Sequence, residues 1–226
     1  MKLPWYIRKY LAGQDSFNRH SIAANLGSNI GGVTALDVGG EGSLAWHMKK
    51  HKVTTTNINN GEIISSGYSL PFTNNAFDVV LSLDTIEHVE KPNRKAFLAE
   101  MNRVAKLGFI ICAPLGTETH IAYEKQMALK GDLDPDCLAY LKQHIEYGLP
   151  TPEEIREWSR LFNGALYYEG CFDEVGTPKY RSKYLSALKN LANNIVYENM
   201  SRNENGLKNM HDGRTNRFYL TAGKKR

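Results

Sequence analysis

Short apolar runs alternate with helix-like segments along the first half of the chain. The run at 78–83 is apolar at most positions, as expected of a strand buried on both faces. A long helix is expected near 93–106. This alternation of strands and helices predicts a doubly wound α/β sheet. The strands are expected at 34–38, 53–57, 78–83 and 108–113, with a short one beginning at Ile63-Ile64 and another helix at 43–51.

The connection after the second strand is short. Only five residues separate Asn57 from Ile63, whereas a helical crossover between parallel strands needs about a dozen. We therefore expect a loop where a doubly wound sheet usually has a helix.

The pattern changes after Pro114. Helices are expected over 118–147, with a break at 131–135. Another begins at Thr151, because a capping Thr, a Pro and two acids follow one another there. An amphipathic stripe at 184–196 is expected to pack on the sheet, although a membrane or a second subunit would also accept it. Further strands are expected at 165–171 and 215–222.

The N-terminal region is predicted to form helices over 5–12 and 14–26, and Asp15 or Ser16 is expected to cap the second. The first residues contain no apolar run of the length of a signal peptide. No stretch approaches the ~20 apolar residues of a membrane span.

Length and cysteine usage indicate one domain in a reducing compartment. A chain of 226 residues is long enough for a single full core. Cys112, Cys137 and Cys171 are odd in number, far apart and in no C-x-x-C pair. Neither a disulfide framework nor a metal site is therefore predicted, and we expect a cytoplasmic protein.

Charge is concentrated in the C-terminal quarter. Residues 176–226 hold 11 Lys and Arg against 3 Asp and Glu, whereas residues 1–175 hold 17 against 21. Such a balance fits an anionic partner or a solvated face. No zinc finger or basic stripe with interleaved aromatic residues indicates nucleic-acid binding.

A glycine-rich turn follows the first expected strand, in Leu36-Asp37-Val38-Gly39-Gly40-Glu41-Gly42-Ser43-Leu44. Glycine allows backbone to approach a ligand closely, and a new helix offers unpaired N–H groups to it. Two interpretations compete. The run from Gly40 to Ala45 fits the dinucleotide fingerprint, but Asn57 stands where that fingerprint wants an acid. The other interpretation begins from Asp37, upstream of the glycines.

The following segment favours the second interpretation. Leu70-Pro71-Phe72, the run from Phe77 to Val80 and Ile86-Glu87-His88-Val89 occur in that order, and residues 93–105 and 108–114 continue the block. This block resembles the type 11 branch of the class I S-adenosylmethionine-dependent methyltransferases, over about residues 34–114. The resemblance implies a Rossmann-like, seven-stranded mixed sheet whose last strand is antiparallel beside the fifth, with helical insertions after the fifth. It also implies one methyltransferase domain over 1–226, comprising an N-terminal helical cap at 1–30, a cofactor-binding core at 31–114 and acceptor-side elements at 115–226.

The resemblance also assigns cofactor contacts, with S-adenosyl-L-methionine as the cofactor. Asn57 takes the place of the acid that usually binds the ribose hydroxyls, Ser66 takes that of an acid near the adenine, and Glu41 and Ser43 stand where the family has glycines. The implied cofactor-binding residues are Asp37, Gly39, Gly40, Gly42, Asn57, Ser66, Gly67, Leu83, Asp84 and Thr85.

Methyl transfer to a hydroxyl needs a base, and histidine is the usual one near neutral pH. His88 and His144 are the candidate catalytic residues, with His120 a further possibility. The His-x-x-Tyr-Gly-Leu-Pro pattern at 144–150 resembles methyltransferases that accompany glycosyltransferases in polysaccharide biosynthesis. The resemblance therefore implies O-methylation of a saccharide or a glycan-linked small molecule.

Three alternatives remain at this point. The acceptor could be another small molecule or a carrier-bound acyl group. The protein could instead methylate or bind RNA, as the basic C-terminal quarter would allow. The departures at Glu41, Asn57 and Ser66 would also fit a protein that binds the cofactor without turnover.

Overall fold

The structure is a computed structural model that describes residues 9–129, 133–170, 183–201 and 207–224. A seven-stranded sheet forms its centre, in the order β3-β2-β1-β4-β5-β7-β6. Neighbouring strands among the first five are parallel, and β7 runs antiparallel to both β5 and β6. This arrangement confirms the predicted mixed α/β sheet. The strands are β1 Thr34–Val38, β2 Lys52–Asn57, β3 Ile63–Ile64, β4 Phe77–Leu83, β5 Ala105–Pro114, β6 Ala165–Glu169 and β7 Arg217–Gly223.

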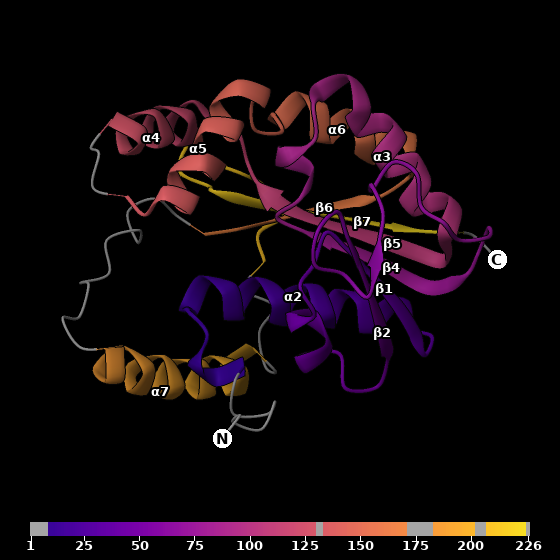
Figure 1. Ribbon diagram of the computed structural model, residues 1–226, viewed down its shortest axis with the longest axis horizontal. Helices are drawn as coiled ribbons and strands as arrows, with labels where there is room; N and C mark the ends of the chain where they lie inside the picture. The colour runs from indigo at the N-terminus through magenta and orange to yellow at the C-terminus, as the bar shows by residue number, and fades with distance from the viewer. Residues whose placement is uncertain (1–8, 130–132, 171–182, 202–206, 225–226) are drawn as a thin grey trace.

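Helices cover both faces of the sheet. Figure 1 shows α2 on one side and α3, α4, α5 and α6 on the other. Their bounds are α2 Gln14–Ile30, α3 Lys91–Val104, α4 Glu118–Leu129, α5 Pro135–Tyr147, α6 Pro152–Leu161 and α7 Lys183–Ser201. Among the described residues, no helix combines the length and the apolar character needed to cross a bilayer.

Each face of the sheet carries its own hydrophobic core. In β1, Leu36 belongs to the core that includes Phe97 of α3, whereas Ala35 belongs to the core that includes Ala23 of α2. Successive strand residues point to opposite faces, so a run that is buried on both faces must be apolar throughout. This explains the continuous apolar pattern of β4 and β5.

Two local predictions near the N-terminus were wrong. The helix expected at 43–51 is only the 3-10 turn η1, Ser43–Trp46. Separate turns follow it, and in one of them the His51 N–H donates to the Met48 carbonyl. Strand β2 then begins at Lys52. The second helix is capped by Gly13 rather than by Asp15 or Ser16, since it begins earlier than its polar residues suggest. Of the helix expected at 5–12, only residues 9–12 are described, and 9–11 are helical.

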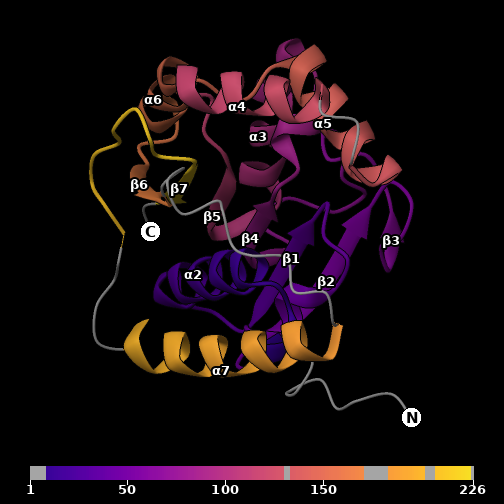
Figure 2. The same cartoon turned by 90° about the vertical axis from the view of Figure 1, so that its left-hand side faces the viewer.

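The placement of the 184–196 stripe was also predicted wrongly. Helix α7 contains it and packs against α2, on the side away from the sheet (Figure 2). The face of the sheet beneath is already covered by α2, so α7 adds an outer layer. Asn194 fixes this layer, because its buried amide donates hydrogen bonds of 3.0 Å to the carbonyls of Tyr10 and Ala12.

The other predicted elements agree with the structure where it describes them. No helix separates β2 from β3, as the short connection required. A capping box formed by Thr151 and Glu154 begins α6. The sixth strand ends at Glu169, and Cys171 lies outside the described residues.

Candidate active site

A cleft of about 910 Å³ opens at the carboxyl ends of β1, β2 and β4. Open parallel sheets bind ligands at this edge. Almost all the predicted site residues line the cleft: Asp37, Gly39, Gly40, Asn57, Ser66, Gly67, Leu83, Asp84, Thr85, His88 and His144. Gly42 is outside the lining and instead gives the turn a left-handed residue, with φ of 89°. His120 is also outside the lining; its Nδ1 lies 2.9 Å from the Leu115 carbonyl.

The glycine-rich turn passes too close to its neighbours for larger residues. Gly39 has φ of 84°, and a Cβ there would lie 2.2 Å from Thr85 Oγ1. A Cβ on Gly40 would lie 2.0 Å from Asp37 Oδ2. At both positions a side chain would collide with the protein itself, so packing against Thr85 and Asp37 requires glycine there.

Asp37 is a buried acid at the floor of the cleft. Asp37 is only 2% exposed, and this burial raises the pKa of its carboxyl group to about 7. The carboxyl group therefore holds its proton up to near-neutral pH. A cationic group in the cleft would favour the ionised form.

Asn57 supports the glycine-rich turn. Its Nδ2 donates to the carbonyls of Gly39 and Gly40, at 2.8 and 3.3 Å, and its Oδ1 accepts from the Asn59 N–H at 3.0 Å. The amide thus lines the cleft while both of its polar atoms are already hydrogen-bonded within the protein.

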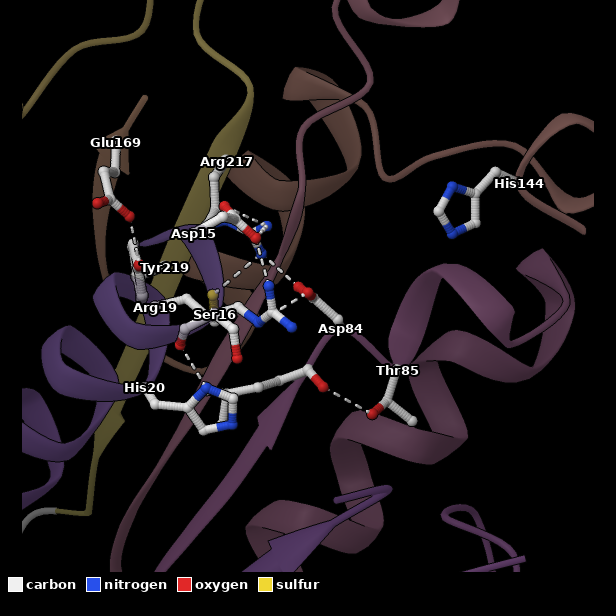
Figure 3. A network of polar contacts seen from close by, with 12 residues as sticks. Asp15, Ser16, Arg19, His20, Asp84, Thr85, His144, Glu169, Arg217 and Tyr219 are labelled. Atoms are coloured by element: carbon white, nitrogen blue, oxygen red, sulfur yellow. Dashed lines mark hydrogen bonds and ion pairs between the residues drawn. The ribbon is translucent and has the colours of Figure 1, made fainter. Parts of the chain in front are cut away.

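Asp84 is the centre of an ionic network at the same edge (Figure 3). Its φ of 47° is left-handed, and its carboxylate pairs with Arg217 and, at 3.0 Å, with Arg19 Nε. Arg217 also reaches Asp15, at 3.3 Å. Burial disfavours the charged form of Asp84, but Arg217 and Arg19 outweigh it and hold its pKa below the ordinary value.

Helix α2 contributes residues that sequence reasoning missed. Ser16, Arg19 and His20 all line the cleft. His20 joins α2 to the glycine-rich turn, because its Nε2 lies 2.9 Å from Ser43 Oγ. Local sequence patterns gave no indication of these residues, since α2 precedes the motif-bearing strands and meets them only in the folded chain.

The other end of the cleft holds Glu87, His88 and His144. Glu87 and His88 lie on the 3-10 turn η2, Ile86–His88, and His144 lies on α5. The imidazole centroids of His88 and His144 are 4.8 Å apart. Arg94 fixes this approach, because it donates to the Val89 carbonyl after η2 and to the Gly148 carbonyl after α5.

Each of these imidazoles is oriented through its Nδ1 atom. His88 Nδ1 lies 2.9 Å from Gln143 Oε1, and His144 Nδ1 lies 2.9 Å from Glu124 Oε1. Burial opposes the ionisation of Glu124, yet hydrogen bonds from His120 and His144 lower its pKa to about 2. The Glu124 carboxylate is therefore ionised and accepts a hydrogen bond from His144 Nδ1–H. In a neutral imidazole that donates in this way, Nε2 carries the lone pair.

Residues 20–112 match a family model described as a methyltransferase domain. The match runs from α2 to β5 and covers the strands that build the cleft. It confirms the prediction that the chain contains a methyltransferase domain. The predicted cofactor, S-adenosylmethionine, agrees with two solved structures of the same fold, which hold it or its product S-adenosylhomocysteine. No curated protein sequence matches the chain.

Solved structures share the fold at low sequence identity. Phosphoethanolamine N-methyltransferase 2 of Haemonchus contortus, in complex with S-adenosyl-L-methionine, is 16% identical with a TM-score of 0.52. The alignment covers 97% of this chain but only 57% of that one. The plantazolicin methyltransferase BamL is 14% identical with a TM-score of 0.55, covering 97% and 86% of the two chains. The [4+2]-cyclase SpnF is 17% identical with a TM-score of 0.52, covering 93% and 82%.

Proposed function

We propose that this protein transfers a methyl group from S-adenosylmethionine to a hydroxyl oxygen of a saccharide or glycan-linked small molecule. The observation that carries the proposal is one continuous cleft. It joins the glycine-rich turn after β1 to two oriented imidazoles, His88 and His144. The saccharide class is supported by the sequence pattern at 144–150.

The residues of the β1 end fit the cofactor. Asp37 offers a buried carboxyl group to the ammonium group of the cofactor's methionine end, and Gly39 and Gly40 line the cleft beside it. We assign Ser66 and Gly67 to the adenine, and Leu83, Asp84 and Thr85 to the sulfonium, as the resemblance implies; all five residues line the cleft. When bound, the cofactor supplies a methyl carbon made electrophilic by its positively charged sulfur.

Asn57 has a different proposed role from the acid that its position usually carries. Its amide holds the carbonyls of Gly39 and Gly40, so it supports the turn rather than accepting both ribose hydroxyls. We keep the proposed division of the chain, in which residues 31–114 hold the cofactor and residues 115–226 supply the acceptor side.

The protein's main task is alignment of the acceptor oxygen with the methyl carbon and sulfur, away from water. A hydroxyl must also be activated to attack. We assign this activation to His88 and His144, because they line the cleft opposite the glycine-rich turn.

A second candidate function is cofactor binding without methyl transfer. It is favoured by the departures at Glu41, Asn57 and Ser66, and by the engagement of both polar atoms of Asn57. A protein named for cyclisation, SpnF, has the same fold. An acceptor screen separates the two candidates.

The proposed function is tested in two steps. First, thermal shifts with S-adenosylhomocysteine and with NAD are compared; a ligand at 100 times its Kd stabilises by about 2.7 kcal/mol. Second, the formation of S-adenosylhomocysteine is followed with a panel of sugars, glycan-linked lipids, phosphoethanolamine and RNA. A shift with the homocysteine product and turnover with a sugar support the proposal. Binding without turnover on any acceptor favours the second candidate, and a shift with NAD alone contradicts both.

A further inference from the structure

We propose that Glu87, His88 and His144 bind a divalent first-row transition metal ion, such as Zn²⁺ or Co²⁺, at the acceptor end of the cleft. One ligand atom from each residue lies within 4.8 Å of the other two. Around a tetrahedral ion, ligand atoms about 2.1 Å from the metal lie roughly 3.4 Å apart. The separations between these ligand atoms therefore need to shorten by at most about 1.4 Å to hold an ion.

The hydrogen bonds around the two imidazoles prepare the same nitrogen of each for a metal. Gln143 and Glu124 engage the Nδ1 atoms of His88 and His144, so Nε2 is the atom left to ligate. Metal-binding histidines characteristically hold their other nitrogen against a carboxylate or carbonyl group in this way. Glu124, His144 and the ion would form such a carboxylate–histidine–metal arrangement.

Unpartnered buried atoms point to the same place. Glu87 Oε2 and His144 Nε2 are both shielded from solvent, and neither has a hydrogen-bond partner in the structure. Glu87 is only 1% exposed. A buried carboxyl oxygen without a partner is costly. A cation ligated by both atoms would satisfy the two together.

The donor set indicates the class of ion. Two imidazoles and one carboxylate suit Zn²⁺, Fe²⁺ and related ions, and leave positions open for a substrate. Mg²⁺ prefers oxygen ligands, so it is a poor occupant of this site.

This inference rests on the proposed function and specifies how the acceptor is activated. The bound cation polarises the acceptor hydroxyl and lowers its pKa. The hydroxyl proton passes to water, the oxygen forms a bond to the methyl carbon, and the carbon–sulfur bond breaks with its electron pair remaining on sulfur. Without a cation, His144 Nε2 would itself accept the proton. The same nitrogen is therefore a metal ligand in one mechanism and the general base in the other.

The test measures metal binding directly. Chelator-treated full-length protein is titrated with Zn²⁺ and Co²⁺ by calorimetry, and the visible absorption of Co²⁺ reports its ligand geometry. We expect one ion per chain, and no comparable binding of Mg²⁺. His144→Ala and Glu87→Gln should each weaken binding beyond the roughly 10–100-fold typical of outer-sphere changes. Gln143→Ala should fall within that range.

His211→Ala serves as the matched control, because the His211 ring contacts that of Tyr168, with centroids 5.3 Å apart, and does not line the cleft. Circular dichroism and the thermal shift with S-adenosylhomocysteine show whether each variant folds. If Glu87→Gln does not fold, His88→Ala replaces it as the second variant that lacks a metal ligand. Failure of the wild type to bind Zn²⁺ or Co²⁺, or equal binding by His144→Ala, overturns the inference. Cofactor binding with chelator-insensitive turnover would leave the proposed function standing while the metal inference fails. Metal binding without cofactor binding would contradict the proposed function alone.

Discussion

Asp84, just after β4, and Arg217, the first residue of β7, form an ion pair across the end of β5. Arg217 also approaches Cys112 Sγ of β5, at 3.7 Å. Arg19 of α2 binds the second carboxylate oxygen of Asp84, at 3.0 Å. The pair therefore joins three strands and one helix at the edge where the cleft opens.

Replacing Arg217 with Ala should destabilise the protein. Removing one partner of a buried ion pair typically costs roughly 3–5 kcal/mol, and we expect a value near the lower end because Arg19 still faces Asp84. Urea unfolding at neutral pH measures the change. Lys208→Ala is the control, because Lys208 is exposed and lies 4.0 Å from Asp212; it should change stability by less than about 0.5 kcal/mol. An unchanged midpoint for Arg217→Ala would show that the pair contributes nothing to stability.

Asp37 should make stability fall as the pH rises toward neutrality. Its folded-state pKa is about 7, whereas an unfolded Asp titrates near about 3.9. Between these values the unfolded chain has lost the proton that the folded chain keeps, so raising the pH favours unfolding. At about 1.36 kcal/mol per pH unit, the total is roughly 4 kcal/mol, and no further change from this group is expected above the folded pKa.

Urea unfolding of wild type and Asp37→Asn across this pH range isolates the contribution. As the pH rises, the unfolding free energy of wild type should fall relative to that of Asp37→Asn. Parallel pH profiles would mean that Asp37 titrates normally and is not buried in solution.

The parts of the site that could be predicted come from contiguous sequence. Apolar runs located β1, β4 and β5 because strands buried on both faces leave few polar positions. The glycines were predicted because a close backbone turn restricts residue type at adjacent positions, and Asp37 because the segment around it resembles a family motif. His144 was predicted from a local pattern as well.

The missed residues act across long sequence separations. Arg19 and Arg217 meet Asp84 only after α2 and β7 pack beside β5, and Glu124 meets His144 only when α4 and α5 come together. No local pattern records such pairs. The placement of α7 failed for a related reason, since an amphipathic stripe specifies a buried face but not whether a sheet or another helix covers it.

The glycines of the turn should not tolerate a methyl group. Gly40→Ala would bring a Cβ within 2.0 Å of Asp37 Oδ2, and Gly39→Ala would combine positive φ with a contact of 2.2 Å to Thr85. Both variants should lose most of the thermal shift with S-adenosylhomocysteine, because the clash displaces the turn or the Asp37 and Thr85 side chains, all of which line the cleft. Gly13→Ala is the matched control, since no atom lies within 4 Å of its Cβ position. A full shift in Gly40→Ala would exclude a close contact between this turn and the cofactor.

Asn57→Asp distinguishes two roles for this side chain, namely support of the glycine-rich turn, which we propose, and binding of the ribose hydroxyls, which the resemblance implies. If Asn57 were merely a weak substitute for a ribose-binding acid, restoring the acid would tighten cofactor binding. In the structure, Nδ2 of Asn57 donates to the carbonyls of Gly39 and Gly40. A carboxylate would place an acceptor against two acceptors and leave both carbonyls without this donor.

We therefore expect Asn57→Asp to weaken binding of S-adenosylhomocysteine and to lower stability by about 0.5–1.5 kcal/mol, the usual net contribution of a hydrogen bond, because these groups are only half-buried. Calorimetric titration gives the affinity, and urea unfolding gives the stability. Asn209→Asp is the matched control, because Asn209 is exposed and does not line the cleft. Tighter binding by the Asp variant would show that the ribose hydroxyls reach this position and that support of the turn is secondary. Weaker binding together with lower stability would instead mean that this chain has replaced a direct cofactor contact with a hydrogen-bonded support for its glycine-rich turn.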